Sequence, residues 1–220
     1  MPIRAVVFDI GGVLEVNPRT GWAERWARRL GSEPGAFAAR LDAMWAPGTI
    51  GAATIEEIEA RTAEALDLDD AALAELMDDA WSEYVGTLNE ELARWFAGLR
   101  PRYRTGILSN SFVGAREREQ ALYGFEEMCD VIVYSHEVGW MKPDARIYRA
   151  VCRQLGVVPE DAVLLDDVPE NIEGARAVGM RAVTFTDTEQ AIAELAAQLD
   201  LPSNGGRDTP RLAGEHQRTV

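Results

Sequence analysis

Four short fragments of this chain place polar groups at, or just beyond, the end of a short apolar run. They are Asp9 with Gly11 and Gly12 after Val6-Val7-Phe8, Ser109-Asn110 after Leu108, Lys142 before Pro143-Asp144, and Asp166-Asp167 after Leu164-Leu165. If the apolar runs are parallel strands, their carboxyl ends meet at one edge of the sheet, where open α/β folds bind ligands. An acid, a hydroxyl, a lysine and two adjacent acids at that edge would form a site for a metal ion and a phosphoryl group.

The first two fragments supply a nucleophile and phosphate ligands. Asp9 is the candidate nucleophile because a carboxylate can attack phosphorus and form an aspartyl-phosphate that water then hydrolyses. Gly11 and Gly12 permit a sharp turn that leaves backbone N–H groups facing an anion. Ser109, through its hydroxyl, and Asn110, through the adjacent backbone N–H, can hold phosphoryl oxygens.

The other two fragments concern charge. The ammonium group of Lys142 could neutralise both the nucleophile and the phosphoryl group during transfer. Asp166 and Asp167 near Asp9 would repel one another unless a cation lay between them. Mg²⁺ prefers such hard oxygen ligands, so the three acids, with the backbone carbonyl of Gly11, are the predicted metal ligands.

Each fragment alone also has an ordinary structural interpretation. Asp9 and its glycines could form a plain turn, and Ser109-Asn110 could cap a loop or a helix. Lys142 could be a solvated surface group, and the paired acids could cap the helix expected at 170–178. The occurrence of all four fragments in this order favours the site.

The elements that must position these groups alternate between strands and helices. Short apolar, β-branched runs are expected to be strands at 3–8, 105–108, 131–134, 162–165 and 182–185, with amphipathic helices at 144–155 and 170–178. This alternation predicts a parallel sheet covered by helices on both faces. Residues 15–88 interrupt the pattern with apolar residues at helical spacing, and the segment Asp67-Leu68-Asp69-Asp70 is a helix-start signal there. The polar segment 202–220 is expected to be a disordered tail.

Composition limits the classes of partner. A chain of 220 residues that is 47% hydrophobic can bury a substantial core, and its formal net charge of −15 argues against binding nucleic acid or an anionic membrane. The same charge would repel a phosphate ester, so local cations such as Lys142 and a metal ion are required. Cys129 and Cys152 show no metal-ligand spacing, and no signal peptide or membrane span is evident, so the expected location is the cytoplasm.

The four fragments together resemble the haloacid dehalogenase-like (HAD) superfamily, and the stretch from Asp166 to Ala175 is similar to its sugar-phosphate phosphatases and to the phosphatase domain of soluble epoxide hydrolases. The resemblance implies a Rossmann-like core at 1–14 and 89–201 with a helical cap at 15–88 inserted after the first strand. It implies a Mg²⁺-dependent hydrolase of a small phosphorylated metabolite. Whether the protein is a monomer or a homodimer stays open at this point. It also implies that Asn171 orients a carboxylate or a metal-bound water.

One position departs from the family pattern. Many family phosphatases carry a second aspartate, a general acid and base, where this chain has Gly11. Its loss costs about 10²–10⁴-fold in rate, unless the leaving group is activated, as in an anomeric phosphate, or Glu15 or a cap residue takes its place. Two alternatives therefore stay open: a metal-independent 2-haloacid dehalogenase, and a catalytically silent protein that binds a phosphorylated metabolite. The paired acids, Asp166-Asp167, favour the phosphatase over the dehalogenase.

Of the tryptophans in the cap, Trp22, Trp26 and Trp45 could line a substrate pocket. Trp22 and Trp26 lie four residues apart, so they share one face of a helix. That spacing favours a place in the interior of the cap for both of them.

Overall fold

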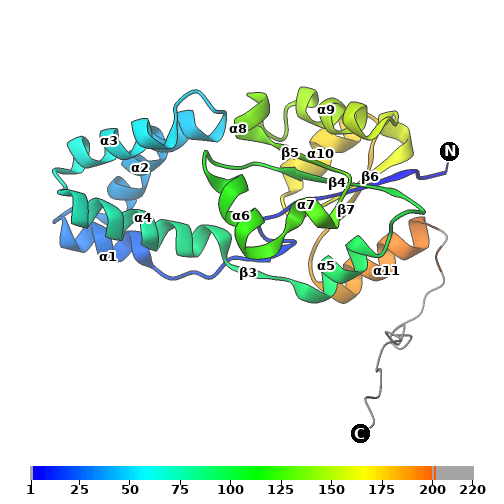
Figure 1. Cartoon of the computed structure of the whole chain (residues 1–220), viewed down its shortest axis with the longest axis horizontal. Coiled ribbons are helices and arrows are strands. Elements are labelled where there is room, and N and C mark those ends of the chain that lie inside the picture. The colour runs from blue at the N-terminus through cyan, green and yellow to red at the C-terminus, as the bar shows by residue number, and fades with distance from the viewer. Residues whose placement is uncertain (1, 200, 202–220) are drawn as a thin grey trace, which may run out of the picture.

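The core of the protein is a parallel sheet of five strands, seen in a computed structural model that describes residues 2–199 and 201 (Figure 1). The strand order is β5-β4-β1-β6-β7, and the strands are β1 (Ala5–Phe8), β4 (Arg104–Ser109), β5 (Val131–Tyr134), β6 (Ala162–Asp166) and β7 (Arg181–Thr184). β1 is central, with Phe8 in register with Ile107 on one side and Leu165 on the other. These strands fall where the apolar runs predicted them.

Helices cover both faces of the sheet because the buried strands are apolar on both sides. Along β1, Val6 and Phe8 face one hydrophobic cluster, which includes residues of α5 (Glu90–Ala97), α7 (Phe125–Met128) and α11 (Thr188–Gln198). Ala5 and Val7 face the other cluster, beneath α9 (Ala145–Leu155) and α10 (Pro169–Ala177). This arrangement confirms the predicted fold class. The connections between these elements contain α6 (Ala115–Tyr123), α8 (Ser135–Val138) and the 3₁₀ helix η1 (Pro159–Asp161).

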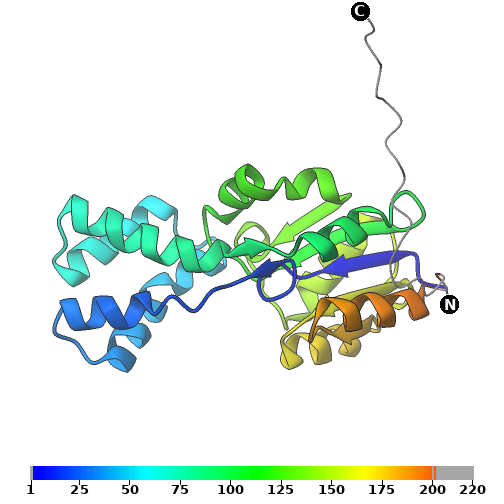
Figure 2. The ribbon, with the colours of Figure 1, turned by 90° about the horizontal axis from the view of Figure 1, so that it is seen from below.

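Four helices form a separate body beside the sheet, which we call the cap (Figure 2). They are α1 (Trp22–Arg29), α2 (Pro34–Thr49), α3 (Ile55–Leu66) and α4 (Asp70–Val85). Their interior is a hydrophobic cluster around Phe37, Ile58 and Leu76. At the expected helix-start signal, the Asp69 carboxylate accepts a hydrogen bond from the Ala72 N–H at 2.8 Å and caps α4.

Two short strands connect the cap to the sheet. β2 (Glu15–Val16) and β3 (Thr87–Leu88) pair in antiparallel fashion where the chain leaves the core and returns to it. The predicted disordered tail, 202–220, lies outside the described residues. Among the helices of the described part of the chain, none combines the length and the apolar character needed to cross a bilayer.

Candidate active site

The candidate site lies at the carboxyl ends of the three central strands. Asp9 follows β1, Ser109 is the last residue of β4, and Asp166 is the last residue of β6. The parallel register brings these ends together, and the Asp9 N–H donates to the Leu165 carbonyl at 2.9 Å. Ser109 is buried and lines the cavity described below. The parallel strands therefore bring together residues that are distant in the chain. Asp9 and Asp166, for example, are 157 positions apart.

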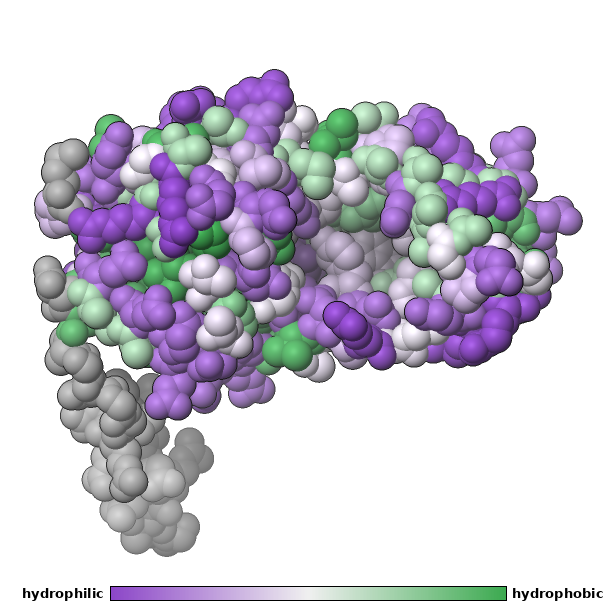
Figure 3. Space-filling model, turned by 180° about the vertical axis from the view of Figure 1, so that it is seen from behind, coloured by the Kyte–Doolittle hydropathy of each residue, from purple (hydrophilic) through white to green (hydrophobic). Residues whose placement is uncertain are grey.

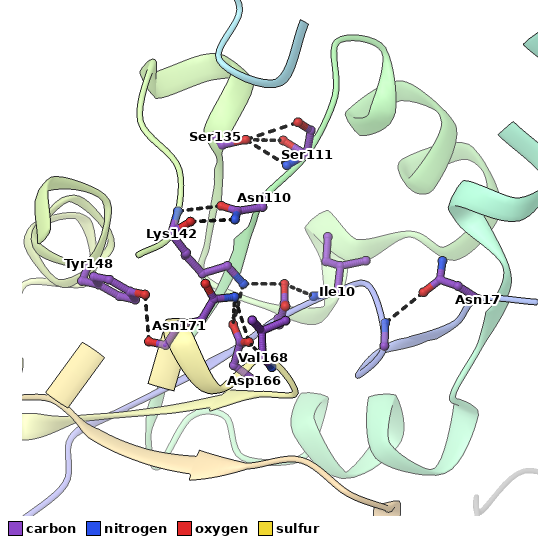
Figure 4. Close-up of polar contacts among 12 residues, drawn as sticks. Ile10, Asn17, Asn110, Ser111, Ser135, Lys142, Tyr148, Asp166, Val168 and Asn171 are labelled. Atoms are coloured by element: carbon purple, nitrogen blue, oxygen red, sulfur yellow. Dashed lines mark hydrogen bonds and ion pairs between the residues drawn. The ribbon is translucent and has the colours of Figure 1, made fainter. Parts of the chain in front are cut away.

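Lys142 links two of the carboxylates (Figure 4). Its Nζ lies 2.7 Å from Asp9 Oδ1 and 2.6 Å from Asp166 Oδ2, and its side chain is 0% exposed. The side chain of Asn110 fixes the lysine loop: its Oδ1 accepts from the Lys142 N–H at 2.7 Å, and its Nδ2 donates to the Lys142 carbonyl at 2.9 Å. Thus the Asn110 amide is occupied in positioning Lys142.

Three acids converge beside the lysine. Asp9, Asp166 and Asp167 each present a carboxylate oxygen, and these oxygens lie within 4.8 Å of one another. Asn171 Nδ2 donates to Asp166 Oδ1 at 2.9 Å and the Val168 N–H donates to the same oxygen at 2.9 Å, so Asp166 is firmly oriented. The expectation that Asn171 orients a carboxylate is consistent with this contact.

Burial and mutual repulsion make this cluster a place for a cation. Burial raises the pKa of Asp9, Lys142 opposes this rise and Asp166 adds to it, and together they place the pKa at about 7. Burial, and then the charge of Asp166, also raise the pKa of Asp167. One ammonium group does not balance three carboxylates. A divalent cation with oxygen ligands fits the donor set, because it would favour the ionised form of all three acids.

The two glycines after Asp9 play different roles. Gly12 has φ +75°, and a Cβ there would lie 2.4 Å from Asp167 Oδ2, so the position requires glycine. Its N–H donates to Asn17 Oδ1 at 2.9 Å and is therefore already paired (Figure 4). A Cβ at Gly11 would meet only Asn17 Oδ1 at 3.6 Å, an ordinary contact. The local structure thus leaves room for a side chain where this chain has none.

A cavity of about 710 Å³ opens beside the acids, between the cap and the core (Figure 3). The core contributes Ile10, Gly11 and Ser109, and the cap contributes Trp22 and Trp45. Most of the surface between these groups is apolar. The cavity is therefore continuous with the proposed phosphate end of the site and large enough for a small organic molecule.

The expectation that Trp22 and Trp26 both fill the cap interior holds for Trp26, which is 2% exposed. It holds only in part for Trp22, which is half-buried, stacks on Trp45 and lines the cavity. Their helical spacing places the two tryptophans on the same face of α1. One part of this face packs into the cap interior and another part borders the cavity, so the two side chains have different surroundings.

The cavity also contains two buried glutamates, and only one of them, Glu15, was a candidate from the sequence. Glu15 is 1% exposed and Glu119, on α6, is 0% exposed, and both line the cavity. Burial, and then the charge of Glu119, raise the pKa of Glu15 to about 9. Burial also raises the pKa of Glu119 to about 7, although the Tyr134 hydroxyl donates to it at 2.5 Å. Glu119 lies in a highly polar helix, so its sequence neighbours give no signal of its burial.

Comparisons with known proteins agree with this geometry. Residues 3–179 match the model of the haloacid dehalogenase-like hydrolase family. Phosphatase MT3486 of Mycobacterium tuberculosis is 32% identical over 83% of this chain and 87% of its own. Bifunctional epoxide hydrolase 2 of Sus scrofa is 26% identical over 89% of this chain, which spans 38% of that longer protein.

Among solved structures, a HAD family enzyme of Bacteroides thetaiotaomicron, in complex with magnesium and inorganic phosphate, superposes with a TM-score of 0.71. It is 21% identical and covers 84% of this chain and 94% of its own, so this likeness concerns the fold. The family match spans most of the chain, and the mycobacterial relative exceeds 30% identity over most of both sequences. The chain is a member of the haloacid dehalogenase-like hydrolase family.

Proposed function

We propose that this protein is a Mg²⁺-dependent phosphatase that hydrolyses a small phosphorylated metabolite through an aspartyl-phosphate at Asp9. The observation that carries the proposal is the Lys142 bridge between Asp9 and Asp166, with Asp167 in reach of the same point. The similarity to a mycobacterial phosphatase supports a phosphate ester as the substrate.

In the proposed reaction, an Asp9 carboxylate oxygen attacks phosphorus as the ester P–O bond breaks. The alcohol leaves with that electron pair and takes up a proton. Water then attacks the phosphorus, releasing inorganic phosphate and restoring Asp9. The Lys142 ammonium and the Ile10 N–H both hold Asp9 Oδ1, at 2.7 and 2.8 Å, which fixes the carboxylate for attack.

Asp9, Asp166, Asp167 and the carbonyl of Gly11 would hold the metal ion. When bound, Mg²⁺ would offset the negative charge of the phosphoryl oxygens and of the acids around them. Ser109 at the end of β4 and the backbone N–H of Asn110 would bind phosphoryl oxygens opposite the nucleophile.

The core and the cap would have different roles in catalysis. The core, at 1–14 and 89–201, carries the chemistry, and the cap, at 15–88, encloses the alcohol side of the substrate. Both parts line the cavity, which supports this division. The dehalogenase alternative is less well supported, because a nucleophile that works without metal gains nothing from Asp166 and Asp167 beside it.

Hydrolysis of p-nitrophenyl phosphate tests the proposal, because its good leaving group does not depend on the acid missing at Gly11. We expect turnover with Mg²⁺, its loss on adding a chelator, and its loss in Asp9→Asn. The matched control is Asp78→Asn, an exposed acid outside the cavity, which should keep the wild-type rate. Absence of phosphatase activity together with halide release from a 2-haloacid would reverse the assignment.

A further inference from the structure

The cavity has an unusual charge for a site that receives a phosphate ester. Its lining includes four acids, Glu15, Asp42, Glu83 and Glu119, and no lysine, arginine or histidine among the described residues. Even with Glu15 protonated, the remaining acids of the lining repel a second anionic group on the substrate, and no basic residue of the lining offsets them. The alcohol part of the substrate must therefore be neutral or positively charged.

Two of these acids each have a buried oxygen atom with no hydrogen-bond partner among the described residues. Glu15 Oε1 and Glu119 Oε1 are fully buried, and neither accepts a hydrogen bond from any residue that the structure describes. Both glutamates are at least nine-tenths buried and line the cavity. A buried carboxylate without a donor or cation is costly, so these oxygens point to a ligand that supplies one.

The cations closest in sequence to Glu119 are engaged elsewhere. Arg116 bonds Glu126 at 2.7 Å and Glu137 at 2.5 Å, and Arg118 donates to the Gly114 carbonyl at 3.0 Å. Neither arginine lines the cavity. The charge of Arg116 opposes the rise in the pKa of Glu119, but in the described part of the chain no hydrogen bond or ion pair joins either arginine to Glu15 or Glu119.

Aromatic rings complete the surroundings of the two acids. Trp22, Trp45, Tyr84 and Phe112 line the same cavity, and the Trp22 and Trp45 rings stack with their centroids 5.9 Å apart. Aromatic faces attract organic cations, and quaternary ammonium groups are commonly bound by several rings together with an acid.

We propose that the substrate carries an amino or quaternary ammonium group on the alcohol side of its phosphate ester, bound by Glu15, Glu119 and the aromatic rings of the cavity. This inference rests on the phosphatase function proposed above. The phosphate would lie at Asp9 and Lys142, beside the cavity, and the cation would lie within the cavity next to Glu15 and Glu119.

The raised pKa values of the two glutamates agree with this assignment. Burial without a compensating cation keeps the proton on Glu15, and an ammonium group bound beside it would favour the ionised carboxylate. The positive charge would also stabilise the departing alkoxide, which lessens the need for the general acid that Gly11 cannot provide. Hydrolysis would yield inorganic phosphate and the free amino alcohol.

Two phosphate esters of nearly the same shape test the inference. Phosphocholine carries a trimethylammonium group, and 3,3-dimethylbutyl phosphate replaces its nitrogen with carbon. We expect kcat/KM with Mg²⁺ to favour phosphocholine by about tenfold or more. The ratio should fall several-fold in Glu15→Gln and Glu119→Gln. The control Glu117→Gln changes an exposed acid on the same helix and should keep the wild-type ratio.

Turnover of p-nitrophenyl phosphate with a ratio of one or less would overturn the inference and leave the phosphatase function intact. If no ester is hydrolysed, the proposed function fails, and calorimetric titration with choline decides the cation site separately. Choline binding that is stronger than binding of 3,3-dimethylbutanol, and that weakens in Glu15→Gln and Glu119→Gln, would support the site. Equal binding of the two alcohols, or none, would refute it.

Discussion

Replacing Lys142 with methionine removes the one positive charge between Asp9 and Asp166. The lysine side chain is 0% exposed, as is that of Asp166, so solvent cannot replace the lost ammonium group readily. Methionine fills a similar volume, which limits any cavity effect. The substitution therefore reports mainly on the electrostatic role of the lysine.

The expected loss of stability follows from two contacts. Removing one partner of a buried ion pair costs about 3–5 kcal/mol, because it leaves a buried charge without compensation. Here Nζ serves two carboxylates, at 2.7 and 2.6 Å, while Asn171 and the Val168 N–H continue to hold Asp166. With about 2–4 °C per kcal/mol for a chain of this size, Lys142→Met should lower Tm by roughly 6–20 °C in chelator.

Thermal and urea unfolding, each with chelator and with Mg²⁺, measure this effect. Mg²⁺ should restore part of the lost stability, since it would supply positive charge to the same acids. The triple variant Lys142→Met with Asp9→Asn and Asp166→Asn removes the repelling charges and should be more stable than Lys142→Met alone. A loss below about 1 kcal/mol in Lys142→Met, or no recovery in the triple variant, would refute the electrostatic reasoning.

Three further outcomes follow from the site. Gly12→Ala should reduce p-nitrophenyl phosphatase activity at least about tenfold, because its Cβ would lie 2.4 Å from Asp167 Oδ2. The matched control is Gly156→Ala, where φ is similar, +70°, and a Cβ would meet nothing within 4 Å. This control should lower stability without loss of activity. Gly11→Asp should raise the rate of alkyl phosphate hydrolysis by about 10-fold or more relative to the rate of aryl phosphate hydrolysis. Equal changes in both rates would contradict a role for the new aspartate as the acid that protonates the leaving group. The pKa of Glu15, raised from 4.5 to about 9, means that the folded protein keeps a proton that the unfolded chain loses, so its stability falls as pH rises through this interval. In urea titrations, Glu15→Gln should gain about 3 kcal/mol relative to wild type between about pH 5 and pH 7, and a constant difference would argue against a protonated Glu15.

The sequence predicted the positions of the groups that end strands. Asp9 and Asp166 each follow a run of apolar residues that can only be buried in a sheet, so the ends of those runs locate the acids. Lys142 carries a further signal: it is the only lysine in the chain, and every other basic residue apart from two histidines is arginine. A compact ammonium group fits between two carboxylates where a planar guanidinium would not.

The groups that line the cavity were harder to predict, because they depend on how the cap packs over the core. Glu119 lies on a helix whose sequence reads as exposed, and its burial comes from contact with Tyr134 and the cavity wall. Asn110 was expected to bind phosphoryl oxygens through its backbone N–H, and the sequence did not indicate that its side chain holds the backbone of Lys142. Neither contact has a periodic pattern, since each joins loops or elements distant in the chain.

The most direct test of the central claim is to trap the covalent intermediate. The protein is mixed with a phosphate ester and Mg²⁺, quenched during turnover, and treated with borohydride, which reduces an aspartyl-phosphate to homoserine. We expect peptide mass spectrometry to find homoserine at Asp9, and to find none when chelator replaces Mg²⁺. Continued release of phosphate with Asp9 unmodified, or homoserine only at another aspartate, would contradict the assignment of Asp9 as the nucleophile.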